Sequence, residues 1–98
     1  MAQRICWAYG WGVLFHHPTV YQIRNDHRLL KDFEDEIPGY LQNGSIAVEL
    51  EKLTLDSRPG SIYDNLMACY QRLVEINVIG KEEIPLLEAW IHDCKSNL

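Results

Sequence analysis

Residues 61–74 read SIYDNLMACYQRLV and place apolar side chains at spacings of three and four along the chain. This spacing puts those side chains on one face of an α-helix. Ser61 and Asp64 have the spacing of a capping box, with Asp64 in the position usually held by Glu or Gln. We therefore predict an amphipathic helix from residue 61, which ends either at Gly80 or before a short strand-like tail over residues 76–79.

The segment after Gly80 predicts a second helix. Lys81-Glu82-Glu83 supplies acidic side chains to its first turn, where the helix dipole favours them, and Pro85 lies in that same turn, where proline is tolerated. The turn between the two helices is short, so we expect them to pair antiparallel, with Trp90 as the buried anchor of the contact. The predicted contact joins Leu87, Trp90 and Ile91 to Leu66, Tyr70 and Leu73.

The N-terminal segment has a different period. Large and small side chains alternate over residues 5–15, which is typical of a β-strand covered on both faces. A hairpin that turns at residues 9–12 is a variant of this prediction. A helix is the competing interpretation, although Gly10 and Gly12 would each cost it about 1 kcal/mol. Residues 19–23 predict a second short strand. We expect the aromatic side chains of this region to lie in the core: Trp7, Tyr9, Trp11, Phe15 and Tyr21.

The middle of the chain predicts further helices. Asn25 or Asp26 can cap a helix that Pro38-Gly39 should end. The apolar face of this helix would consist of Leu29, Leu30, Phe33 and Ile37. Asn43-Gly44-Ser45 then predicts a turn followed by a new helix cap. Residues 46–55 fit both a strand and a helix, and we interpret them as a helix because their polar residues are good helix formers.

These elements fit in one small domain. The chain has 98 residues, a mass of 11.4 kDa and 47% hydrophobic residues, which is enough for a single core and too little for two. We predict an α+β fold over residues 1–98 that is mostly helical. In it, the N-terminal strand or hairpin packs on about four helices. An all-α bundle is the alternative.

The cysteines indicate a reducing compartment. Cys6, Cys69 and Cys94 are odd in number and widely spaced, so they form neither a disulfide framework nor a CxxC motif. We expect buried thiols and a cytoplasmic protein. The chain contains no run of about 18 apolar residues, and residues 1–17 lack the pattern of a signal peptide, so we expect neither a membrane span nor a leader.

The sequence contains no recognisable catalytic or cofactor-binding motif. It lacks GxSxG, GxxxxGK[ST] and GxGxxG, and its histidines do not have the HxxxH spacing of a helical metal site. We therefore predict no catalytic residues, no metal ligands and no cofactor. The alternative is a small enzyme or metal-dependent protein that uses His16, His17 and His27, with Asp26 nearby.

Binding to nucleic acid is disfavoured by charge. Aromatic side chains on a strand can stack on single-stranded bases, but such surfaces interleave them with basic residues. No Lys or Arg lies between residues 5 and 23, and the net charge of the chain is −5. We expect no direct contact with DNA or RNA.

Acidic residues are concentrated in the later part of the chain. Residues 1–31 carry four basic residues and one acidic residue, whereas residues 32–98 carry five basic and thirteen acidic ones. The densest group is Asp32, Glu34, Asp35 and Glu36, which we call the acidic cluster. One interpretation is a solvated face that keeps the protein soluble. The other is a surface for a basic partner, because complementary charge selects partners and speeds association. We predict that the acidic cluster faces such a partner.

A small acidic domain without catalytic motifs is similar in type to bacterial immunity proteins and antitoxins. Those proteins bind a toxin and cover its active site or substrate surface. The similarity is one of size and charge and implies a protein partner, expected to be a basic toxin such as a nuclease. We do not expect a membrane or a small-molecule ligand. The sequence therefore predicts a cytoplasmic inhibitor that acts by occlusion.

Overall fold

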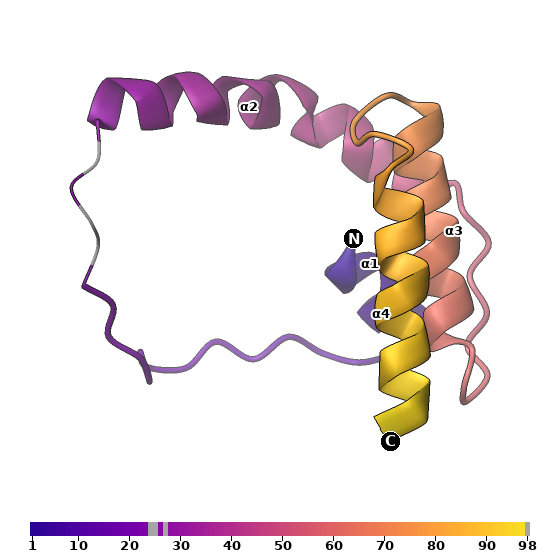
Figure 1. Ribbon diagram of the computed structural model, residues 1–98. Helices are drawn as coiled ribbons and strands as arrows, with labels where there is room; N and C mark the ends of the chain where they lie inside the picture. Colours follow the sequence, from indigo (N-terminus) through magenta and orange to yellow (C-terminus); the bar gives the residue numbers. More distant parts are fainter. Residues whose placement is uncertain (24–25, 27, 98) are drawn as a thin grey trace.

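The computed structural model describes residues 1–23, 26 and 28–97, and its regular structure there is helical. The helices are α1 (Ala2–Ala8), α2 (Leu29–Glu51), α3 (Ile62–Glu75) and α4 (Glu83–Asn97). The pair formed by α3 and α4 lies side by side, α1 packs against α3, and the long α2 runs away from this body (Figure 1). The described residues contain no strand, so the α+β prediction is wrong and the all-α alternative fits.

The N-terminal segment forms a short helix and then an irregular chain, instead of a strand or hairpin. Helix α1 ends because Gly10 adopts a left-handed backbone, with φ of +68°. The amide of Trp11 donates to the carbonyl of Cys6 (2.9 Å) and that of Gly10 to the carbonyl of Trp7 (3.1 Å). These are the two hydrogen bonds of a Schellman motif. Gly10, which we placed in the turn of a possible hairpin, is therefore a helix stop, and residues 19–23 have no regular structure either.

Helix α2 is longer than the sequence predicted. It begins after Arg28, whereas Asp26 lies outside it and Asn25 lies outside the described residues. It continues through Pro38-Gly39 and Asn43-Gly44-Ser45, so neither the predicted stop nor the predicted turn exists. A proline inside a helix removes one backbone hydrogen bond, a cost that tertiary packing at one end of the helix can outweigh. Residues 46–51 are helical, as predicted, and the helix ends at Glu51.

The C-terminal end of α2 is held by a side chain of α1. The Arg4 guanidinium donates from Nε to the Leu50 carbonyl (3.2 Å) and from Nη2 to the Leu53 carbonyl (2.6 Å). The last carbonyls of a helix have no partner within the helix and carry partial negative charge, which a guanidinium satisfies. Arg4 thereby joins two elements that are nearly fifty residues apart in the sequence.

The core lies where α1, α2 and α3 meet. Ile5, Leu50, Cys69 and Leu73 form its buried cluster, and Cys69 is fully buried. Burial raises the pKa of the Cys69 thiol, which keeps it protonated and unreactive. The prediction of a buried thiol is confirmed for Cys69, whereas Cys6 and Cys94 are only partly buried.

The predicted capping box at the start of α3 does not form. The Ser61 hydroxyl makes no cap bond to the helix and instead contacts the carbonyls of Arg58 (2.6 Å) and Asp56 (3.1 Å) in the preceding loop. At its other end, α3 stops at a second Schellman motif and not at Gly80. There the amide of Val78 donates to the Leu73 carbonyl (2.9 Å), next to Asn77 with φ of +57°. Residues 76–79 form this turn and no strand.

A charged network joins α2 to α3. The Glu49 carboxylate forms ion pairs with Lys52 on one side and with Arg72 of α3 on the other, and Arg72 also pairs with Glu75 (2.8 Å). The hydrogen bond from Lys52, followed by that from Arg72, lowers the pKa of Glu49 below its ordinary value. The carboxylate is thus favoured in the folded state.

This network predicts a specific dependence of stability on pH. A carboxyl group whose pKa is lower in the folded chain stabilises the fold above its unfolded pKa, and this stabilisation is lost as pH falls through its folded pKa. We therefore expect the melting temperature of Glu49→Gln to lie below that of the native chain at neutral pH and to converge with it in acid. Thermal unfolding of both proteins across that range is the measurement. A difference that persists unchanged at pH values below the folded pKa of Glu49 would contradict the assignment.

Candidate protein-binding surface

The first two thirds of α2 project away from the core. The side chains of α2 that pack on the core belong to its last turns, chiefly Ile46 and Leu50. Residues 29–45 precede them and extend beyond the body formed by the other helices (Figure 1). This projecting part of the helix carries most of the features that could contact another molecule.

One face of α2 is apolar and exposed along its length. Its members are Leu30, Phe33, Ile37, Leu41 and Val48, which we call the outer band. Their exposed fractions range from 38% to 83%. At about 100° per residue these positions fall within one stripe, on the side of the helix opposite to Ile46 and Leu50. The apolar residues keep their spacing of three and four across Pro38, so the pattern for this band is present in the sequence. We did not recognise it because we predicted that the helix would end at Pro38.

The structure brings the acidic cluster together on the first turns of α2. Lys31 lies among these carboxylates, with Nζ 2.9 Å from Oδ1 of Asp35 and 3.2 Å from Oε2 of Glu34. Hydrogen bonds to Asp35 and then to Glu34 raise the pKa of Lys31. The Tyr40 hydroxyl donates to Glu36 (2.9 Å). The cluster as a whole retains a strong excess of negative charge, and its member Asp32 lies in the first turn of α2, where the helix dipole favours a carboxylate.

Most aromatic side chains of the N-terminal segment are exposed, so the prediction that they form the core is wrong. Phe15 and Tyr21 are about 90% exposed, and Trp7 and Trp11 are about half exposed. Only Tyr9 of this group packs against the core cluster, and its ring stacks on that of Trp11 at 4.8 Å between centroids. The core is filled instead by aliphatic side chains and Cys69, which leaves these rings on the surface.

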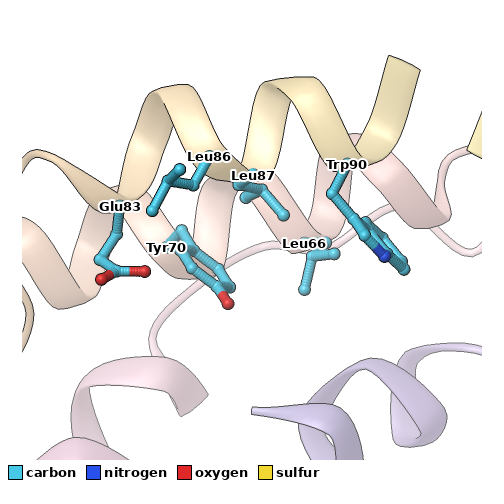
Figure 2. Close-up of a pocket in the computed structure, with 6 residues that line it drawn as sticks. All are labelled: Leu66, Tyr70, Glu83, Leu86, Leu87 and Trp90. Carbon is cyan, nitrogen blue, oxygen red and sulfur yellow. The ribbon is translucent and has the colours of Figure 1, made fainter. Parts of the chain in front are cut away.

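A second surface feature is a shallow groove between α3 and α4 (Figure 2). Its volume is 290 Å³, and it is lined by Leu66, Tyr70, Glu83, Leu86, Leu87 and Trp90. A neighbouring hollow at α1 shares Leu66 and Trp90 with this groove. The lining supplies one carboxylate, one phenol and one indole as polar groups, which do not form a set of nucleophile, base and orienting residue.

Trp90 belongs to this groove and is not the buried anchor of the helix pair. It is 53% exposed, whereas Leu87 and Ile91 are buried between α3 and α4 as predicted. Each residue of a helix is rotated by about 100° from the next, so Trp90 lies at the edge of the contact that Ile91 occupies. Its ring meets the ring of Tyr63 edge-on, at 6.3 Å between centroids.

The three histidines that the structure describes are not assembled into a site. His16 and His17 are exposed in the irregular segment, where Nδ1 of His16 lies 2.6 Å from the carbonyl oxygen of His17. His92 is exposed on α4, and His27 lies outside the described residues. Among residues 1–23, 26 and 28–97, no group of three or more His, Cys, Asp or Glu side chains is placed to hold a metal ion.

Comparisons with protein-family models, with curated proteins and with solved structures gave no match. Within the part of the chain that the structure describes, no helix combines the length and the apolar character needed to cross a bilayer. The surface of the molecule is therefore the basis for a functional assignment.

Proposed function

We propose that the protein binds another protein without catalysing a reaction, and that its partner is a basic toxin, as for immunity proteins and antitoxins. The toxin would be a cytoplasmic nuclease or a similar cationic enzyme, and binding would occlude its active site or substrate surface. The observation that supports this proposal most is the position of the acidic cluster. Its four carboxylates lie on a stretch of helix that projects from the body of the molecule.

This position suits an electrostatic mechanism of recognition. A projecting helix can reach into a concave basic surface, such as the phosphate-binding cleft of a nuclease, while the body stays outside. Complementary charge of this kind raises the association rate and selects the partner more than it adds raw affinity. An enzyme or metal-dependent protein built on His16 and His17 has less support, because both side chains are exposed on an irregular segment.

The proposal predicts that capture of a basic protein depends on the acidic cluster. Native cell extract passed over the immobilised chain at low salt should leave a cationic protein bound, released as salt rises, because screening weakens exposed charges. Neutralising the cluster with Asp32→Asn, Glu34→Gln, Asp35→Asn and Glu36→Gln should slow association about tenfold or more. The purified partner should lose its toxic activity when the native chain is added.

The matched control makes the same change in charge elsewhere on the molecule. Glu82, Glu83 and Glu88 replaced by Gln, together with Asp93→Asn, remove four carboxylates from the region of α4. This variant should associate at a rate close to that of the native chain. If both quadruple variants bind equally, or if the captured protein is acidic, the acidic cluster is not the recognition surface and the proposal fails.

A further inference from the structure

The protein exposes far more surface than a compact chain of its mass. Its accessible surface is 8262 Å², whereas a folded monomer of 11.4 kDa is expected to expose about 5,800 Å². Its Cα radius of gyration is 16.2 Å, against about 13 Å for a compact domain of this length. The excess of about 2,500 Å² is shared between the irregular residues 10–23, which are exposed throughout, and the projecting part of α2. One subunit of an obligate homodimer buries about 1,000 to 2,500 Å².

The outer band of α2 is a continuous apolar part of this excess surface. It extends from Leu30 to Val48 and is about 27 Å long at the rise of an α-helix. It lies on the side of α2 opposite to the core contacts of Ile46 and Leu50, so the packing of α2 on the core leaves it exposed. We propose that the protein forms a homodimer in which the outer bands of two α2 helices pack antiparallel.

The outer band is complementary to itself in this orientation. When the two helices cross at residue 39, Leu30 lies opposite Val48 of the second copy and Ile37 lies opposite Leu41. The large ring of Phe33 then falls beside Gly44 of the second copy. A Cβ atom built at Gly44 meets no atom within 4 Å, so the space above this glycine is open to receive a ring. Each pair of helices contains this contact twice, as two-fold symmetry requires.

The charges of α2 select the antiparallel orientation. A parallel pair would bring the two acidic clusters side by side, and like charges at such distances repel. An antiparallel pair places each acidic cluster beside residues 42–46 of the second copy. Residues 37–48 contain no charged side chain, so this part of α2 does not repel the carboxylates of the second copy. For the same reason, this part of the outer band has no charge that would favour a basic protein over a second copy as its partner.

The dimer does not depend on the proposed binding of a toxin. Asp32, Asp35 and Glu36 point away from the outer band, at about 120° to 160° around the helix from Leu30. These three carboxylates of each acidic cluster therefore remain exposed in the dimer, whereas Glu34, about 40° from Leu30, lies at the edge of the outer band. A native chain that stays monomeric would leave the test of the acidic cluster unaffected. An acidic cluster that recognises no basic protein would likewise leave the dimer proposal unaffected.

The experiment is to determine the mass of the full chain in solution over about a hundredfold range of concentration, by sedimentation equilibrium. We expect a reversible equilibrium that ends at a dimer. Gly44→Gln should raise the dissociation constant by at least about tenfold, because the new uncharged side chain fills the space that receives Phe33. Gly39→Gln is the matched control, since residue 39 lies on the opposite side of α2 and its substitution should leave the dimer intact.

A swap of the large and the small residue tests the orientation. Phe33→Ala and Gly44→Phe should each weaken the dimer, and the double variant should recover most of the loss, because these positions meet only in an antiparallel pair. Circular dichroism at low concentration should show unchanged helix content, which separates lost association from lost folding. A native chain that stays monomeric, or equal effects of Gly44→Gln and Gly39→Gln, would overturn the proposal and leave the outer band to a different protein. The absence of recovery in the double variant would overturn the antiparallel orientation.

Discussion

Replacing Leu50 by alanine should lower the free energy of unfolding by about 3 kcal/mol, because it empties the centre of the core. Leu50 is 3% exposed and belongs to the cluster in which α1, α2 and α3 meet, together with Ile5, Cys69 and Leu73. Its carbonyl also accepts a hydrogen bond from Arg4, so the same residue fixes the end of α2. For a domain of this size the loss corresponds to a fall in melting temperature of more than about 10 °C.

The control for this prediction is another leucine of the same helix. Leu29 is 75% exposed and lies outside both the core and the outer band, so Leu29→Ala should change stability by less than about 0.5 kcal/mol. Both variants are to be compared with the native chain by denaturant unfolding at one protein concentration, since any association would make stability depend on concentration. Equal effects of the two substitutions would mean that the end of α2 does not pack on the core.

The C-terminal half of the fold could be predicted from the sequence because its signals are local. The spacing of apolar residues in α3 and α4 matches one face of a helix, and the short turn between them leaves little choice but an antiparallel pair. The sequence left the end of α3 open between Gly80 and the start of a tail over residues 76–79, and the helix ends before that tail, at Glu75. Asn77 adopts the left-handed backbone there instead, as asparagine does more readily than most residues.

The N-terminal half could not be predicted in the same way, because distant contacts decide it. The alternation over residues 5–15 fits a strand, yet a strand needs a partner, and the described residues provide none. A helix of seven residues has little stability alone, and α1 exists because Ile5 enters the core and Arg4 caps α2. Neither contact is visible in local sequence.

The candidate surface was partly predictable. The acidic cluster follows from composition alone, and the structure places it on one exposed stretch of helix. The outer band was not recognised because Pro38-Gly39 was expected to end the helix. The aromatic side chains of the N-terminal segment were assigned to the core for a different reason, namely that a small domain needs large rings to bury enough area. A contiguous patch of large apolar side chains on the surface of a small protein indicates contact with another molecule.

A polar cluster beneath the loop before α3 carries the other large effect that we expect. Asn65 is 4% exposed, and its side chain accepts a hydrogen bond from the Asp56 amide (2.9 Å) and donates to the Asp56 carbonyl (2.7 Å). Its amide also donates to the Tyr9 hydroxyl (3.3 Å), which lies 2.8 Å from the Ser61 hydroxyl. One buried side chain therefore holds the loop, α1 and α3 together.

Asn65→Leu should lower the free energy of unfolding by about 2 kcal/mol, although it keeps the branched shape and the number of non-hydrogen atoms of the side chain. The cost arises because the part-buried backbone N–H of Asp56 loses its partner and its C=O keeps only the Ser61 hydroxyl, and an unsatisfied buried group costs about 1 to 3 kcal/mol. Gln71→Leu, the same type of change at an exposed position of α3, should have an effect below about 0.5 kcal/mol.

Tyr9→Phe should cost about 1 kcal/mol in the native chain and less in the Asn65→Leu background, since the two side chains share a hydrogen bond. Denaturant unfolding of the four variants measures this coupling. Additive losses would show that Tyr9 and Asn65 act separately, and an Asn65→Leu protein as stable as the native chain would show that water reaches the Asp56 backbone in place of the amide.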